Sequence, residues 1–331
     1  MSSLPARKPI DSKCSSGPTY YPPSTGLVSY LPSSFVPYAE LMRLDRPAGI
    51  YLFFVPHLLG TLYAAALSPN DIRVQSLLQT LLILYAGTVF MRGAACSWND
   101  NLDQEYDRQV YRCKTRPIAR GAVSTVKGHI FTAFLTAIAA GFLMLLPRTV
   151  IPYAIPSIFL LWLYPFTKRF TDYPQIILGL QMSLGVFVGI VATGVDPMEQ
   201  PLPKQISMIA LYGALVTWTV IYDTIYACQD SKDDAKAGVK SMAVRFLPWM
   251  RPMLWGCAAV MVSLLVTCGI EAGFSEGYYL FMGCGGVTLS LTAMIGTVNL
   301  DDPASCLWWF KNTYWQVATP LSLGFLAEYA A

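Results

Sequence analysis

Long apolar stretches without a single charged residue alternate along this chain with short, charged segments. Asp, Glu, Lys and Arg are absent from eight windows of at least 18 residues: 47–70, 74–91, 128–147, 149–167, 173–195, 205–222, 252–270 and 277–300. A helix needs about 20 apolar residues to cross the hydrocarbon core of a bilayer. The windows lack the period-2 alternation of barrel strands, and only helices or closed barrels satisfy their backbone groups in lipid. Each window therefore predicts a membrane-spanning helix.

A ninth stretch, 303–327, is broken only by Lys311. With it, the pattern predicts an all-α integral membrane protein of nine transmembrane helices. Composition agrees, because 54% of the residues are hydrophobic and only 13% are charged, whereas soluble domains usually carry about a quarter charged residues. The alternative, a soluble protein with eight buried core helices, is disfavoured by this deficit of charge.

The basic residues are distributed unevenly between the segments that connect the helices. With a cytoplasmic N-terminus, 19 of the 23 Lys and Arg residues lie on the cytoplasmic side, as the positive-inside rule favours. Frequent prolines predict a disordered cytoplasmic tail over 1–40, followed by a membrane domain over 41–331. Neither a signal-peptide core nor an Arg-rich presequence is evident. We therefore expect the endoplasmic reticulum membrane rather than the mitochondrial inner membrane.

Acidic residues gather at the ends of the second and sixth predicted helices, on one side of the membrane. Asp100, Asp103 and Asp107 are spaced i, i+3 and i+7, so on a helix they share one face. The second cluster, Asp223, Asp230 and Asp234, is spaced i, i+7 and i+11 and also shares a face. Stacked carboxylates repel one another unless a cation lies between them, and an all-oxygen set suits Mg2+. The pattern therefore predicts magnesium sites.

The two clusters also suggest an internal duplication. Asp100 and Asp230 are 130 residues apart, as are Asp103 and Asp233, and each cluster follows the second helix of a group of four. We therefore expect two four-helix halves around a shared cavity, plus one further helix. Cations that could stabilise a phosphorylated leaving group lie nearby: Arg112, Lys114, Arg116, Arg120, Lys168, Arg169, Lys236, Lys240 and Arg245.

These segments resemble the UbiA superfamily of intramembrane prenyltransferases. Residues 99–107 match the family's NDxxDxxxD motif, and residues 222–234 match its YDxxYAxxDxxxD motif. Further similarity lies in the segments 43–47, 115–121 and 164–169, so the resemblance spans about 40–300. The phenolic-acceptor branch, which includes the 4-hydroxybenzoate polyprenyltransferases, is the most similar, and within it the fungal meroterpenoid enzymes.

The resemblance implies a UbiA-like bundle that uses Mg2+ and an isoprenyl diphosphate. It implies catalytic roles for both acidic clusters, with Mg2+ held by Asp100, Asp103, Asp107, Asp230 and Asp234 and assisted by Asp223. Residues expected to bind the diphosphate are Asn99, Arg112, Arg116, Lys168 and Arg169, and those expected to bind the carboxylate of an aromatic acceptor are Arg43 and Arg46. The expected reaction is transfer of a farnesyl group to an orsellinate-type phenolic acid in secondary metabolism.

Two other functions remain open at this point. One is a 4-hydroxybenzoate polyprenyltransferase of ubiquinone biosynthesis. The other is an ion-coupled transporter, since intramembrane acids and paired repeats suit carriers as well, although carriers usually place such acids near the midplane. We expect the lipid bilayer and the small-molecule substrates as partners, and neither nucleic acid nor a protein partner.

Overall fold

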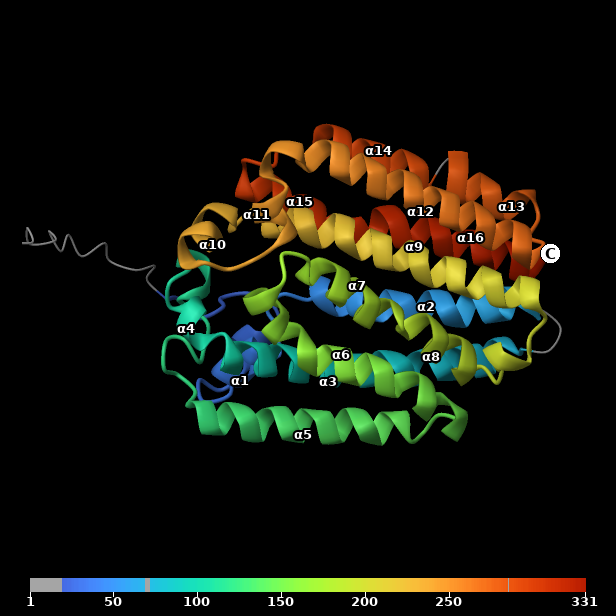
Figure 1. The fold of residues 1–331 in the computed structure, drawn as a ribbon. Helices are drawn as coiled ribbons and strands as arrows, with labels where there is room; N and C mark the ends of the chain where they lie inside the picture. The colour runs from blue at the N-terminus through green and yellow to red at the C-terminus, as the bar shows by residue number, and fades with distance from the viewer. Residues whose placement is uncertain (1–19, 69–71, 285) are drawn as a thin grey trace, which may run out of the picture.

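The computed structural model describes residues 20–68, 72–284 and 286–331, and every regular element in these ranges is helical (Figure 1). The first part of the chain forms α1 (Val36–Leu41), α2 (Ala48–Leu67), α3 (Val74–Leu102), α4 (Gln104–Asp107), α5 (Thr125–Leu143) and α6 (Ile151–Phe170). The middle part forms α7 (Pro174–Ser183), α8 (Gly185–Ala192), α9 (Leu202–Ala227), α10 (Ser231–Ala237) and α11 (Met242–Arg245). The last part forms α12 (Met250–Ala272), α13 (Glu276–Tyr279), α14 (Val287–Thr297), α15 (Pro303–Thr313) and α16 (Thr319–Ala330).

Short 3-10 segments connect several of these helices. They lie at Leu27–Tyr30, Tyr111–Cys113, Arg148–Val150, Pro197–Glu199 and Leu247–Trp249. Two π-helical segments, η6 (Leu280–Cys284) and η7 (Tyr314–Ala318), interrupt the last part of the chain. The ninth apolar stretch is therefore helical as α15, η7 and α16 in succession.

Eight helical segments in the described ranges are long and apolar enough to cross a membrane. They coincide with the eight charge-free windows: Ala48–Leu67, Val74–Leu102, Thr125–Leu143, Arg148–Thr167, Pro174–Ala192, Leu202–Ala227, Leu247–Ala272 and Glu276–Thr297. This confirms the all-helical membrane architecture. The ninth segment, α15 to α16, is more polar and is not among the eight, so the count of nine stays a prediction.

The long helices run roughly side by side along one direction (Figure 1). In the first half α3 packs against α5, and in the second half α9 packs against both α7 and α12. The halves meet where α2 packs along α8, and α16 also packs against α2. Large apolar side chains on the outer faces of α3, α5 and α12, such as Leu82, Phe134 and Val260, are exposed. Such faces suit lipid rather than water.

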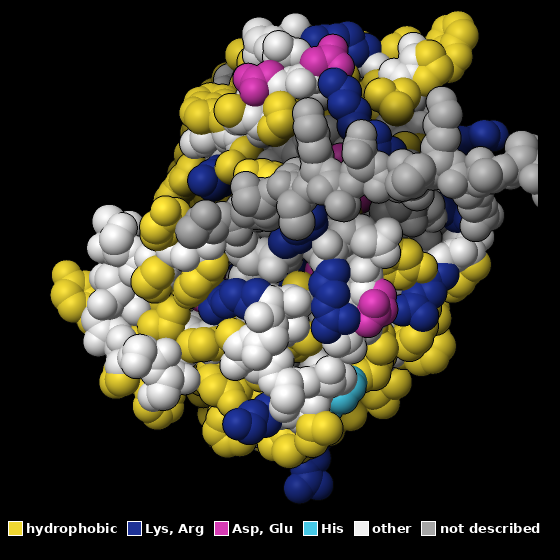
Figure 2. Space-filling model, turned by 90° about the vertical axis from the view of Figure 1, so that its left-hand side faces the viewer, with side chains coloured by type: hydrophobic (Ala, Val, Ile, Leu, Met, Phe, Trp, Pro, Cys, Tyr) yellow, Lys and Arg dark blue, Asp and Glu magenta, His cyan; other side chains and the backbone are white. Residues whose placement is uncertain are grey.

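The segments that carry the acidic clusters lie at one end of this bundle. α4, α10 and α11 lie together at the left of Figure 1, and the C-terminus lies at the opposite end. Seen from that left-hand end, Lys and Arg side chains are scattered across the surface, and hydrophobic side chains lie around its edge (Figure 2). The fold thus gathers the charged segments at one end of an apolar bundle.

Residues 1–19 of the predicted tail lie outside the described residues. The rest of that segment is described: it contains a 3-10 turn at Leu27–Tyr30 and the short helix α1. The boundary at residue 40 remains a prediction.

Candidate active site

The first acidic cluster sits where α3 ends and the chain turns. α3 ends at Leu102, Asp103 joins it to α4, and Asp107 ends α4. The exposed fractions of Asp100, Asp103 and Asp107 are only 1%, 3% and 5%. Buried carboxylates need compensating cations or hydrogen bonds. The cluster therefore depends on its neighbours for neutralisation.

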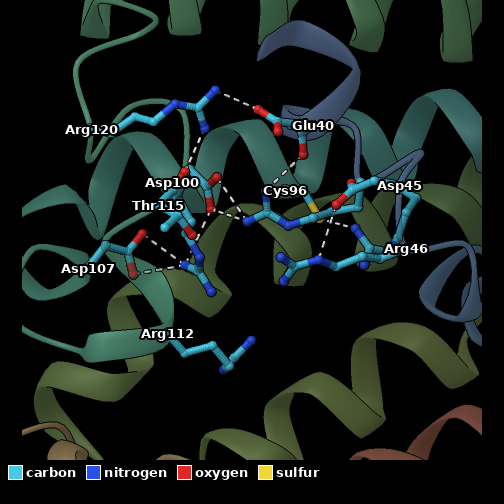
Figure 3. A network of polar contacts seen from close by, with 12 residues as sticks. Glu40, Asp45, Arg46, Cys96, Asp100, Asp107, Arg112, Thr115 and Arg120 are labelled. Carbon is cyan, nitrogen blue, oxygen red and sulfur yellow. Dashed lines mark hydrogen bonds and ion pairs between the residues drawn. The ribbon is translucent and has the colours of Figure 1, made fainter. Parts of the chain in front are cut away.

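Arginines from two other segments neutralise this cluster (Figure 3). Arg43, in the turn after α1, donates from Nη2 to both oxygens of Asp100, at 2.6 and 2.9 Å. Arg116 donates from Nη1 to both oxygens of Asp107 at 2.8 Å, and the same nitrogen lies 3.4 Å from Asp100. Burial alone lowers the pKa of the Arg116 guanidinium, but Cys113, Asp100 and Asp107 together raise it well above its usual value. Arg116 therefore stays charged.

The second cluster follows the end of α9 and is bound by an arginine from the segment after the first cluster. α9 ends at Ala227, and Asp230 is the residue that precedes α10. Arg112, from the segment after α4, donates from Nε and Nη2 to the Asp230 carboxylate at 3.0 and 2.5 Å. Its Nη1 donates to the Tyr226 hydroxyl at 2.9 Å. Burial lowers the pKa of Arg112, but Tyr226 and Asp230 outweigh this effect and raise it. The two halves of the bundle are thus joined at their acidic ends.

The other aspartates of the clusters are also engaged. Asp103, Asp107, Asp223 and Asp234 all interact with other residues. Asp233, which the spacing left outside the metal-binding set, faces Lys236 at 4.0 Å and is 43% exposed. The Asp230 side chain, at 14% exposed, is therefore more enclosed than that of Asp233.

The remaining residues that the sequence singled out lie around this network. The Oδ1 atom of Asn99 is buried and has no hydrogen-bond partner within the described structure. Arg169 donates to the Leu102 carbonyl at 3.1 Å and lies over the Tyr106 ring. Arg46 is more than half exposed and pairs with its neighbour Asp45 at 3.1 Å. The side chain of Lys168 lies outside the described part of the chain.

The donor set fits Mg2+, although the carboxylates do not converge on one point. Within the described residues no three acidic, His or Cys side chains form a ready metal site. Mg2+ needs only one or two carboxylates, however, and takes its other ligands from water and phosphate. Buried aspartates and the unpartnered Asn99 oxygen are oxygen donors of the required kind. We therefore regard the site as chemically suited to Mg2+.

Two neighbouring side chains, Tyr20 and Glu40, were absent from the predicted site, and they contact Arg120, which the sequence marked only as a nearby cation. Arg120 donates to Glu40 at 2.7 Å (Figure 3). The Tyr20 hydroxyl donates to the other oxygen of Glu40 at 2.8 Å. The Arg120 guanidinium also lies 3.7 Å from the centre of the Tyr20 ring. Arg120 follows the first cluster in sequence, so its place near the site could be predicted. No sequence pattern indicates that Tyr20 or Glu40 lies near the site. Arg92, which directly follows the second charge-free window, was a signal that the positions of the charges could have raised.

The all-helical membrane bundle, with acidic clusters and arginines gathered at one end, has the architecture of an intramembrane enzyme, and the comparisons with known proteins identify the family. The chain belongs to the UbiA prenyltransferase family, whose sequence pattern matches residues 53–317. It is 37% identical over 280 residues to the prenyltransferase ascA of Acremonium egyptiacum, covering 85% of this chain and 82% of that one. It is 43% identical over 247 residues to the DMOA farnesyltransferase nvfB of Aspergillus novofumigatus, covering 75% and 77%.

Solved structures of the same family share the fold. A UbiA homologue from Archaeoglobus fulgidus bound to DMAPP and Mg2+ superimposes with a TM-score of 0.66 at 18% identity, covering 89% of this chain and 99% of that one. A UbiA homologue from Aeropyrum pernix gives a TM-score of 0.64 at 21% identity, covering 84% and 96%. The protein is thus a multi-pass membrane enzyme that transfers prenyl groups, as the motifs predicted, and the transporter alternative is set aside.

Proposed function

We propose that this enzyme transfers a farnesyl group from its diphosphate to the ring of an orsellinate-type phenolic acid, with Mg2+, in meroterpenoid biosynthesis. The observation that carries the proposal is the Arg112–Asp230 contact, because it holds the segment that follows the first acidic cluster against the second cluster, which belongs to the other half of the bundle. A diphosphate with its metal ions needs both carboxylates and cations around it. The name of the relative from Aspergillus novofumigatus supports the farnesyl donor.

In this proposal each cluster has a defined role. Mg2+ bound between the clusters would act as a Lewis acid on the diphosphate oxygens. The chain would hold it through Asp100, Asp103 and Asp107 on one side and through Asp230 and Asp234 on the other, with Asp223 and Asn99 assisting.

The cations and the apolar helices complete the chemistry. Arg112, Arg116, Lys168 and Arg169 balance the negative charge of the departing diphosphate. The C1–O bond breaks with its electron pair on the diphosphate, an electron-rich ring carbon bonds to C1, and the ring then loses a proton. Tyr226, whose ring packs 4.2 Å from that of Phe310, offers an aromatic face near the allylic cation. The surrounding apolar helices exclude the water that would quench this cation.

Incubation of enriched membranes with isotopically labelled prenyl diphosphates tests the proposal. Geranyl, farnesyl and geranylgeranyl diphosphates are each combined with orsellinic acid, 4-hydroxybenzoate and other phenolic acids, and the products are identified by mass. We expect farnesylated orsellinic acid, complete inhibition by EDTA and recovery when Mg2+ is restored. The assignment would be contradicted if products formed with the other acceptors but not with orsellinate-type acids.

The aspartates are tested with a control aspartate, Asp233, which lies three residues after Asp230. Asp103→Ala and Asp230→Ala should each abolish transfer, because each removes a carboxylate that would hold Mg2+. Asp233→Ala should keep most of the activity, since Asp233 is 43% exposed and faces Lys236. Full activity in either of the first two variants would remove the metal assignment.

Two simple observations separate this function from ubiquinone synthesis. Expression in a ubiquinone-deficient yeast strain should not restore respiratory growth, and a fluorescent fusion should label the endoplasmic reticulum. Restored growth with a mitochondrial fusion would favour 4-hydroxybenzoate as the acceptor instead.

A further inference from the structure

Five residues form a closed ring of contacts at the acidic end of the bundle. Arg43 and Arg116 both lie within ion-pair distance of Asp100, at 2.6 and 3.4 Å. Arg43 also donates from Nη1 to the backbone carbonyl of Glu40 at 2.9 Å. The Glu40 carboxylate accepts from Arg120 at 2.7 Å, and the Arg120 amide donates to the Arg116 carbonyl at 2.9 Å. Glu40 and Arg120 therefore connect the two arginines of Asp100 to each other.

The Glu40–Arg120 ion pair is enclosed and joins two separate segments. The exposed fractions of the two side chains are only 10% and 15%. Glu40 belongs to α1, whereas Arg120 belongs to the segment that precedes α5, where its Nη1 also donates to the Thr115 carbonyl at 2.6 Å (Figure 3). An enclosed pair of this kind is costly to break, because either partner alone would be left as a buried charge. The pair therefore fixes α1 relative to the segment that carries Arg116.

The backbone of Arg43 shows that its position is imposed by its neighbours. Among the non-glycine residues of the described ranges, only Arg43 has a positive φ, 57°. It is the second residue after α1, a position in which the left-handed conformation usually belongs to glycine. Strained backbone persists only where surrounding contacts hold it, and it gathers at functional sites. Here the Arg43 amide and Nη1 both donate to the Glu40 carbonyl, at 3.0 and 2.9 Å, so Glu40 holds the conformation that brings Arg43 to Asp100.

We propose that Glu40 and Arg120 are positioning residues, whose ion pair holds Arg43 and Arg116 on Asp100. This inference rests on the proposed function, in which Asp100 would hold Mg2+ and Arg116 would bind the diphosphate. Two guanidiniums fixed beside Asp100 weaken the binding of a metal ion there in the absence of the donor, because like charges repel. They also form a preorganised pair of cations for the diphosphate. Loss of the ion pair should therefore change metal binding and donor binding in opposite directions.

The test measures both kinds of binding on full-length protein in lipid nanodiscs. Mn2+ is the metal probe, and its affinity without donor is measured by electron paramagnetic resonance. The KM for farnesyl diphosphate is measured at saturating Mg2+. In Glu40→Gln we expect the Kd for Mn2+ to fall by about tenfold, the effect of one charge-assisted contact. We expect the KM for farnesyl diphosphate to rise by about tenfold, as for the loss of a residue that orients a ligand.

Other variants of the pair should reproduce or spare this effect. Arg120→Gln should act like Glu40→Gln, and the double variant should be no worse than either single one, because all three lack the same contact. Arg120→Lys keeps the charge and should stay close to the wild type. Glu105→Gln is the matched control, because Glu105 pairs with Arg108 at the same end of the bundle but is 76% exposed. It should leave both constants unchanged.

A purely structural comparison comes from Leu41. This side chain is 0% exposed and packs in an apolar cluster between α1 and the segment that precedes α5. Leu41→Ala should loosen the same two segments and lower the denaturation midpoint. It removes no charge, so it should not produce opposite changes in the Kd for Mn2+ and the KM for farnesyl diphosphate.

The contrary outcomes are distinct from one another. Unchanged constants in Glu40→Gln, with normal Mn2+ binding by the wild type, would overturn the positioning role and leave the proposed function standing. Weaker binding of both Mn2+ and the donor in Glu40→Gln would also overturn it, since the ring would then only support the fold. A wild type that binds neither Mn2+ nor farnesyl diphosphate would overturn the proposed function, and the positioning role with it.

Discussion

Arg112 and Asp230 are 118 residues apart in sequence, yet the guanidinium donates from both Nε and Nη2 to that one carboxylate. Arg112 belongs to the segment after α4 in the first half, and Asp230 precedes α10 in the second. The contact therefore closes one end of the bundle across its two halves. Both side chains are less than a third exposed, so the pair is shielded from much of the screening that weakens surface ion pairs.

A double-mutant cycle on this pair should show strong coupling. We expect Arg112→Met or Asp230→Asn alone to lower the free energy of unfolding by about 2 kcal/mol, since each leaves a partly buried charged group without its partner. The double variant should cost less than the sum of the two. The stability losses of the two single variants and the double variant are measured by thermal denaturation in detergent, with the remaining folded protein quantified by size-exclusion chromatography. Strict additivity would mean that the contact contributes nothing to joining the halves.

Asp100 should be the aspartate whose loss is most damaging to stability. It is 1% exposed and neutralises Arg43 while also lying near Arg116. Asp100→Ala would leave a buried guanidinium without its carboxylate, at a cost of about 3–5 kcal/mol. The double variant Asp100→Ala with Arg43→Met should recover part of that loss but no activity. Denaturation midpoints and prenyl transfer measured on the same preparations distinguish the two effects.

The membrane helices could be predicted closely because charge cannot enter lipid cheaply. The charge-free window 47–70 predicted a helix, and the structure has α2 at Ala48–Leu67. The window and the helix agree because the nearest polar residues limit both. The break between α7 and α8 was not predictable, because window 173–195 is apolar throughout and hydropathy carries no sign of a bend at Leu184. The interruption of the last stretch by η7 was missed for the same reason.

The acidic clusters were predictable and their partners were not. Asp100 lies in the last turn of the second helix of its half, and Asp230 lies just after the second helix of the other half, so their placement at one end follows from helix counting alone. That Asp230 pairs with Arg112 depends on how the segment after α4 folds back. Irregular segments of this kind have no periodicity from which a contact could be predicted. Arg43 was assigned to the acceptor on the family resemblance, but its contact with Asp100 requires the turn after α1, where its φ is 57°.

The close approach of α2 and α8 should make Gly189 intolerant of any side chain. A Cβ at this position would lie 2.9 Å from the backbone nitrogen of Thr61 and 3.0 Å from its Oγ1. Small residues at such crossings let membrane helices pack closely. Gly189→Ala should therefore destabilise the protein by about 1–3 kcal/mol, the usual cost of overpacking.

Gly141 on α5 provides the matched control for this prediction. Nothing lies within 4 Å of a Cβ added there, so Gly141→Ala should leave the denaturation midpoint unchanged or slightly higher, because Ala favours helix over Gly. Equal midpoints for the two variants would show that α2 and α8 can separate at no cost.

The contact of Tyr20 with Arg120 and Glu40 should hold the segment before α1 against the acidic end of the bundle. The Tyr20 hydroxyl donates to Glu40 at 2.8 Å, while its ring stacks on the Arg120 guanidinium. Tyr20→Phe keeps the ring and loses only the hydrogen bond, so it should have a small effect. Tyr20→Ala loses both contacts, of which the cation–π interaction alone contributes about 0.5–2 kcal/mol.

Limited proteolysis of the membrane-embedded protein measures this attachment directly. Cleavage between residues 20 and 35 should be slow in the wild type, little faster in Tyr20→Phe and fastest in Tyr20→Ala. Glu40→Gln should fall between these variants, because it weakens the Arg120 ion pair and leaves the stacking of Tyr20 in place. If Tyr20→Phe were cleaved as fast as Tyr20→Ala, the hydrogen bond rather than the stacked ring would be the contact that holds the segment.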